Sequence, residues 1–128
     1  WNGSYVLFSK VNGAAAALAA VNRELQQHPE LKKYLVSSGT FNWRYIRGTK
    51  RLSSHAFATA IDIGVAKYAD YWKNSGLSEA STQLVYRNRM PLELAKIFEK
   101  HGFIWGGYWY HYDTMHFEYH PEIIAANP

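Results

Sequence analysis

Two histidines and two aspartates stand at spacings that could build a metal-dependent hydrolytic site. His55 and Asp62 lie seven positions apart, and Asp113 precedes His116 by three. Two imidazoles and one carboxylate would leave the fourth position of a tetrahedral zinc ion open, as in catalytic zinc sites. The ion would lower the pKa of bound water towards ~7, and a nearby base would still have to take the proton. We therefore predict His55, Asp62 and His116 as zinc ligands and Asp113 as the general base.

Alternating polarity predicts two strands that bring part of this set together. Residues 59–65 alternate with Asp62 on the less apolar face, and residues 114–119 alternate with His116 opposite an apolar row. Because directly opposed side chains of paired strands lie within about 5 Å of each other, Asp62 and His116 can converge on one ion. His55 stands at the end of a polar loop, from which it can fold back over the same face.

A third strand and two helices complete the predicted framework. Residues 40–46 alternate with Arg44 on the polar face. Residues 12–27 have apolar positions three and four apart, which is typical of a helix, and residues 91–100 have Pro in the first turn and Gly102 just past the end.

The remaining segments give weaker signals. A short helical piece is expected over residues 30–36 before the Ser-Ser-Gly sequence at 37–39 breaks the pattern. Residues 67–89 are expected to form an ordered excursion with one helical stretch, and residues 105–112 form an aromatic segment with glycine hinges. This order of elements predicts the α+β class, with a central antiparallel sheet flanked by helices and the metal site on one sheet face.

Composition limits the kind of protein this can be. With 128 residues, 48% hydrophobic and 19% charged, one globular domain over residues 1–128 is expected. The chain has no cysteine, which excludes disulfides and thiolate zinc sites. Its net charge of +4 favours anionic partners. The longest apolar run, residues 14–21, is far shorter than the roughly 20 residues of a membrane span. The start at Trp1 is compatible with removal of a signal peptide.

Two segments resemble a known family. Residues 53–62 (SSHAFATAID) and 113–116 (DTMH) look like the two signature motifs of the zinc D-alanyl-D-alanine carboxypeptidase and L-alanyl-D-glutamate endopeptidase family, whose members cut bacterial peptidoglycan. The resemblance runs from the helix near Asn12 to Glu118. It is strongest in GTFNWR, RLSSHAFATAIDI and WYHYDTMHFEY.

The resemblance implies roles for further residues. In that family an Arg on the strand before the first motif helps to hold the substrate carbonyl or carboxylate; Arg44 matches it, with Arg51 as a nearby substitute. The family usually has Gly three positions after the first ligand, where this chain has Ala58. An Asp base, as at position 113, resembles the L-alanyl-D-glutamate endopeptidase branch more than the carboxypeptidase branch.

Three more residues are candidates for supporting or substrate-binding roles: Ser53, His111 and Glu118. Glu118 is predicted to orient a ligand rather than to bind the ion itself. His111 either lines the cleft or packs among tyrosines. The aromatic segment as a whole is expected mainly to pack, with one or two rings left to line a substrate groove.

The function expected from the resemblance is zinc-dependent hydrolysis of peptidoglycan stem peptides by a monomeric protein of the bacterial periplasm or cell envelope, or alternatively by a phage endolysin. We expect no nucleic-acid partner. Three alternatives stay open at this point. The first is a non-catalytic zinc-binding domain of the same fold. The second is a non-haem iron oxygenase, although its His and carboxylate usually stand about two positions apart. The third is a basic nucleic-acid-binding module, which the charge alone would allow.

Overall fold

The computed structural model describes residues 1, 13–35, 37–39, 60–64 and 68–121. Within them the elements are, in chain order, α1 (Ala14–Leu25), a 3-10 helix (Pro29–Tyr34), β1 (Ser37–Gly39), β2 (Ala60–Ile63), a 3-10 helix (Trp72–Ser75), α2 (Leu92–Lys100), β3 (Phe103–Trp105), a 3-10 helix (Gly106–Tyr108) and β4 (His116–Tyr119). The strand predicted for residues 40–46 lies outside the described residues, as do Arg44, Arg51, Ser53, His55 and Ala58.

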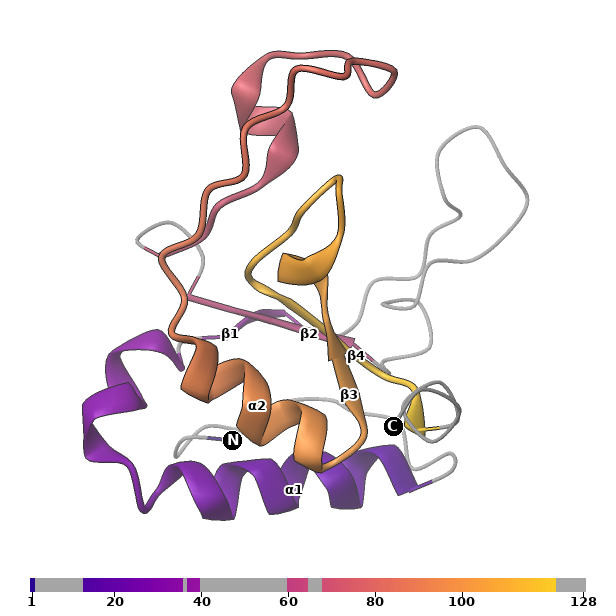
Figure 1. Cartoon of the computed structure of the whole chain (residues 1–128). Coiled ribbons are helices and arrows are strands. Elements are labelled where there is room, and N and C mark those ends of the chain that lie inside the picture. Colours follow the sequence, from indigo (N-terminus) through magenta and orange to yellow (C-terminus); the bar gives the residue numbers. More distant parts are fainter. Residues whose placement is uncertain (2–12, 36, 40–59, 65–67, 122–128) are drawn as a thin grey trace.

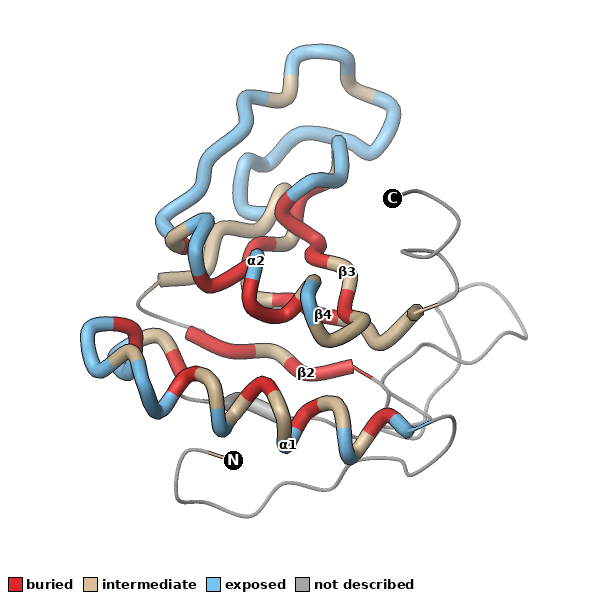
Figure 2. The backbone as a smooth tube through the Cα atoms, turned by 60° about the horizontal axis from the view of Figure 1, so that its bottom comes forward, coloured by how far each residue is buried: buried red, intermediate tan, exposed pale blue. Residues whose placement is uncertain are grey.

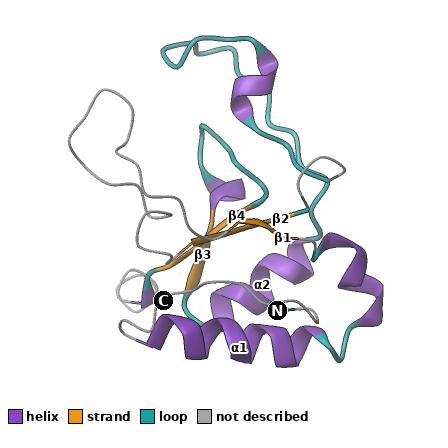
Figure 3. Cartoon of the chain, turned by 180° about the vertical axis from the view of Figure 1, so that it is seen from behind, coloured by secondary structure: helices purple, strands orange, loops and turns teal. Residues whose placement is uncertain are grey.

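The described strands form one antiparallel sheet in the order β1-β2-β4-β3. Helices α1 and α2 lie together on one side of it, and two long loops project from the other side (Figures 1 and 3). The α+β prediction with a central antiparallel sheet is therefore confirmed.

The core fills the layer between the helices and the sheet. The ring of Phe98 on α2 stacks on Phe117 of β4 with centroids 3.9 Å apart, and both side chains are fully buried. Leu18, Val21 and Leu25 of α1 join the same cluster, as their spacing of three and four residues predicts. Burial of this apolar face orients β2 and β4, because every second side chain must turn away from the helices.

The helices match their predicted positions with one shift. Helix α1 falls inside the predicted range, and α2 starts at Leu92 with Pro91 at the N-cap rather than in the first turn. Gly102 follows α2 with φ 94°, a left-handed conformation that glycine adopts without steric cost. It also lies close to Tyr119, so the helix end packs directly against β4.

Two short strands were missed by the sequence analysis. The Ser-Ser-Gly segment, expected to break the pattern, forms the edge strand β1, and Phe103–Trp105 forms β3 at the opposite edge. Strands of three residues are too short to show alternation. Their conformation is set by pairing with β2 and β4, which lie far away in the sequence.

Residues 68–90, here called the arm, run outward from the sheet as a loop with one short 3-10 helix (Figure 1). Most of the arm is exposed (Figure 2). Residues 106–113, here called the aromatic loop, project from the same side of the sheet. The sequence predicted an ordered excursion with one helical stretch over residues 67–89, and the arm with its 3-10 helix occupies this part of the chain.

None of the described helices is long and apolar enough to cross a membrane.

We expect Phe98→Ala to lower the free energy of unfolding by about 3–5 kcal/mol, because it removes a buried ring and leaves a cavity against Phe117. Urea denaturation followed by circular dichroism measures the change. The control is Leu92→Ala on the same helix, where the residue is 49% exposed and the expected change is within about 0.5 kcal/mol. Equal losses in the two variants would contradict this view of the core.

Candidate metal centre

The pairing of β2 with β4 places Asp62 directly opposite His116. His116 Nδ1 lies 2.9 Å from Asp62 Oδ1, and the two side chains are 8% and 22% exposed. Both residues belong to the sheet face opposite the core, because their neighbours Ile61, Ile63 and Phe117 are buried under the helices. The structure thus brings together two of the residues predicted as ligands.

Glu118 holds the other side of the imidazole. His116 Nε2 lies 2.7 Å from Glu118 Oε1, and His120 Nε2 lies 2.9 Å from Glu118 Oε2. Residues 116 and 118 share one strand face, so this contact follows from their spacing of two. A carboxylate that fixes one ring nitrogen of a histidine while the other faces a metal is a common feature of metal sites.

These carboxylates change the protonation of the imidazole. Burial by itself would lower the pKa of His116, but hydrogen bonds and charges from Asp62 and Glu118 outweigh it and raise that pKa to about 10. Burial would likewise raise the pKa of Glu118, yet His116 and then His120 lower it to about 2. In the metal-free protein the centre therefore holds a protonated His116 between two carboxylates.

The pair formed by Asp62 and His116 fits a zinc ion in chemistry and in spacing. Ligand atoms at about 2.0–2.2 Å from a tetrahedral zinc lie roughly 3.4 Å apart. The observed separation of 2.9 Å would have to open by about half an ångström, and the proton shared between Nδ1 and the carboxylate would have to leave. The third predicted ligand, His55, lies outside the described residues.

Asp113 lies at the start of the turn into β4. Its N–H donates to the carbonyl of Gly106 at 3.0 Å, and its own carbonyl accepts from the N–H of His116 at 3.2 Å. A Cβ at position 106 would lie 2.5 Å from the Asp113 carbonyl oxygen, so glycine is needed for this close approach. One carboxylate oxygen of Asp113 is fully buried. The turn therefore fixes Asp113 relative to His116.

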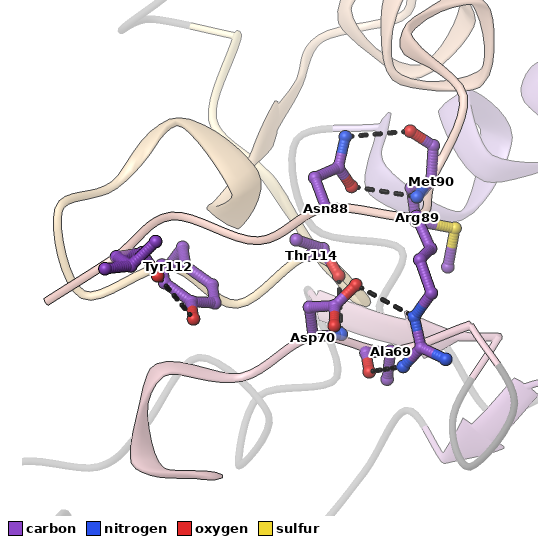
Figure 4. A network of polar contacts seen from close by, with 8 residues as sticks. Ala69, Asp70, Asn88, Arg89, Met90, Tyr112 and Thr114 are labelled. Atoms are coloured by element: carbon purple, nitrogen blue, oxygen red, sulfur yellow. Dashed lines mark hydrogen bonds and ion pairs between the residues drawn. The ribbon is translucent and has the colours of Figure 1, made fainter. Parts of the chain in front are cut away.

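Thr114, between these two residues, is clamped by the arm (Figure 4). Its N–H donates to the carbonyl of Asp70 at 3.0 Å, and its buried hydroxyl accepts from the N–H of Asp70 at 2.9 Å. Arg89 closes the other end, donating from Nε to the Asp70 carboxylate at 3.1 Å and from Nη2 to the Ala69 carbonyl at 2.7 Å. The start of the arm thus holds the turn that carries Asp113, and Arg89 ties the other end of the arm to this start.

The aromatic loop divides between packing and exposure. Trp105, which leads into the loop, and Tyr112 are each 2% exposed, in agreement with a packing role, whereas Tyr108, Trp109 and Tyr110 are all more than a third exposed. The ring of Trp109 lies 5.6 Å from that of His116. In a run of aromatic residues, no pattern of spacing separates this ring from its neighbours.

His111 turns away towards the arm. Its Nε2 donates to the carbonyl of Glu79 at 2.7 Å, and its ring lies 4.6 Å from Trp72. The sequence predicted that His111 either lines the cleft or packs among tyrosines. Its observed contacts are packing contacts, with the rings of Trp72 and Tyr110.

A separate group of possible ligand atoms lies at the helix ends. His28 Nδ1 is 3.2 Å from Glu30 and 3.4 Å from Glu93, and the two carboxylates are more than half exposed. It includes none of the predicted ligands. Exposed acidic groups of this kind are common without a metal.

Comparison with known families agrees with the motif positions. A family model described as D-alanyl-D-alanine carboxypeptidase matches residues 47–119, more than half of the chain. The chain belongs to this family of zinc peptidases. The part of the chain that matches the family model contains His55, Asp62, Asp113 and His116, whereas Arg44 lies before it. Comparisons with curated proteins and with solved structures gave no significant match.

We expect the His116 ring in chelator-treated protein to remain protonated at pH 8, with its pKa near 10. Because the folded pKa lies above the ordinary value of 6.5, this group contributes stability that is complete below pH 6.5 and is lost as the pH rises towards 10. NMR titration of the ring nitrogens measures the midpoint. Asp62→Asn removes one of the two carboxylates and should lower that midpoint. A wild-type midpoint near 6.5 would show that the two carboxylates do not raise the pKa of His116.

Proposed function

We propose that this protein is a zinc-dependent peptidase that hydrolyses peptide bonds in peptidoglycan stem peptides, of the D-alanyl-D-alanine carboxypeptidase or L-alanyl-D-glutamate endopeptidase type. The observation that carries the proposal is the direct opposition of Asp62 and His116 across β2 and β4, with Asp113 fixed three residues before His116. Family membership supports the metallopeptidase class and a peptidoglycan substrate.

The proposed ligands are His55, Asp62 and His116. When bound, zinc supplies the Lewis acidity that polarises a carbonyl and lowers the pKa of water towards ~7. Glu118 keeps His116 in one tautomer and orientation, since its carboxylate accepts from Nε2 and leaves Nδ1 facing Asp62. The chemistry of these donors, nitrogen and carboxylate oxygen without thiolate, suits zinc.

Asp113 is the proposed general base. It takes the proton of the attacking water and returns it to the leaving amine, which a carboxylate can do when it is held within reach of both. The backbone contacts to Gly106 and His116 and the clamp on Thr114 support this role, because they leave the Asp113 backbone little freedom. Arg44, or Arg51 in its place, is proposed to hold the substrate carbonyl or carboxylate.

The other predicted residues take supporting roles in this proposal. Ser53 is proposed to contact the substrate or a ligand at the start of the first motif. His111, bonded to Glu79 and packed on Trp72, supports the aromatic loop rather than the reacting peptide. We also propose that the ring of Trp109 forms one wall of the site beside His116.

We further propose that residues 1–128 act as one monomeric domain in the bacterial cell envelope or as the wall-cutting part of a phage endolysin. The net charge of +4 supports contact with an anionic wall. Neither setting changes the chemistry of the site.

Asp113→Ala should retain zinc yet lose cleavage of stem peptides by at least about a hundredfold, which is the lower range for a positioned acid-base group. Mass spectrometry of muropeptides and synthetic stem peptides, digested with and without a chelator, identifies the bond and the metal dependence together. Metal content is measured on the same samples. Wild-type protein that binds zinc and cuts nothing would indicate a non-catalytic zinc domain, and unchanged cleavage by the variant would remove Asp113 from the mechanism.

Glu118→Gln should weaken zinc binding by about 10–100-fold, because the neutral amide holds the His116 ring less firmly and lowers its basicity. Competition with a fluorescent zinc chelator measures the dissociation constant. Glu79→Gln is the matched control, since the side chain is exposed and, within the described part of the chain, only the backbone carbonyl of Glu79 accepts a hydrogen bond. Equal zinc affinities of Glu118→Gln and wild type would show that Glu118 does not support the ligand.

A further inference from the structure

A cavity of about 510 Å³ lies along the arm, and its lining includes Asp70, Tyr71, Asn74, Arg87, Arg89 and Tyr112. None of these residues belongs to the predicted zinc site. We propose that this cavity is a substrate subsite that binds a carboxylate of an acidic peptide, with Arg87 as the residue that recognises it. The identity of the peptide as a wall stem peptide rests on the proposed function.

The charges of the lining favour one anionic group. Arg89 and Asp70 form an ion pair at 3.1 Å, so their charges compensate each other. Arg87 is exposed, and among the described residues it makes no hydrogen bond or ion pair. The lining therefore carries one uncompensated positive charge. A guanidinium presents two parallel N–H donors that match the two oxygens of a carboxylate.

The cavity adjoins the proposed base. Tyr71 forms an isolated antiparallel bridge with Asp113, and side chains of directly opposed residues lie on the same face within about 5 Å. Tyr112, which also lines the cavity, immediately precedes Asp113 in the chain. A peptide with a carboxylate on Arg87 can therefore extend past Tyr71 towards the zinc site.

The arm is held in place before any substrate arrives. The hydroxyl of Tyr112 donates to the carbonyl of Val85 at 3.1 Å, and that of Tyr110 donates to the carbonyl of Ser81 at 2.8 Å (the Tyr112 contact is drawn in Figure 4). Together with the bond from His111 to Glu79, these contacts join the arm to the aromatic loop along much of its length. A preformed cavity loses less entropy when a ligand binds.

An acidic peptide fits this lining better than a polyanion does. Nucleic acids and phosphate-rich polymers are bound by several cations acting together. Here Asp70 neutralises Arg89 and only Arg87 is uncompensated, so the lining balances a single negative charge. Asn74 and Gln83 add neutral amide groups that can bond to peptide backbone.

The test compares binding of three synthetic stem pentapeptides to zinc-loaded Asp113→Asn protein, which keeps the full chain and suppresses turnover. One peptide carries its glutamate and terminal carboxylates free, and each of the others has one of them amidated. Calorimetry should show that amidation of one carboxylate raises Kd about tenfold. Adding Arg87→Gln should raise Kd for the free peptide by a similar factor and abolish the difference between acid and amide. Arg87→Lys should retain part of the difference in Kd between the free and the amidated peptide.

Arg23→Gln in the same background is the matched control, because it removes the same charge from an exposed position on α1. It should leave every Kd within about twofold of the parent. An unchanged preference for acid over amide in Arg87→Gln would overturn the inference, as would equal binding of all three peptides by the parent. Inorganic phosphate that displaces the free peptide at equal concentration would reassign the cavity to phosphate and overturn it too.

The two proposals fail separately. Discrimination that depends on Arg87, in a protein whose wild type cuts no stem peptide, would support the subsite and refute the peptidase. Zinc-dependent cleavage with equal binding of acid and amide would support the peptidase and refute the subsite. Thermal unfolding of each variant confirms that the comparison is made between folded proteins.

Discussion

The register between β2 and β4 is the constraint on which the rest of the site depends. It sets Asp62 opposite His116 and, at the same time, buries Ile61, Ile63 and Phe117 under the two helices. A slip of one residue would turn the polar side chains into the core and the apolar ones out of it. The hydrophobic burial that folds the domain is therefore also what holds these two groups within 2.9 Å of each other.

Placing ionisable groups in so enclosed a position carries a cost that the structure offsets locally. His116 is 6% exposed and lies between two carboxylates, and each of its ring nitrogens has a partner at hydrogen-bond distance. Charge compensation of this kind is what makes buried ionisable groups tolerable. A divalent cation at Nδ1 would replace the single charge of the proton with two, and the two carboxylates would compensate it.

Asp62 and His116 are placed by the sheet, whereas contacts between loops hold Asp113 and the segments around it. The turn through Asp113 is held by Gly106 from one side and, from the other, by Asp70 at the start of the arm through Thr114. The arm and the aromatic loop are joined by side chains that bond to backbone carbonyls. Such contacts allow exposed segments to keep one shape without a core of their own, and they explain how polar loops can wall a binding cavity beside the sheet.

The sequence by itself determined the helices, strands β2 and β4, and the sharing of one face by His116 and Glu118, because long or regular polarity patterns record which face is buried. Motif spacing also identified the family, later confirmed by the match over residues 47–119. The metal-binding, catalytic and supporting roles of all the predicted site residues stay predictions, and Arg44, Arg51, Ser53 and His55 also lie outside the described residues. Only the tertiary structure decided β1 and β3, the clamp on Thr114 and the place of Trp109 beside His116. Those features arise from contacts between distant segments, and pairing partners of that kind leave no periodic trace in either segment alone.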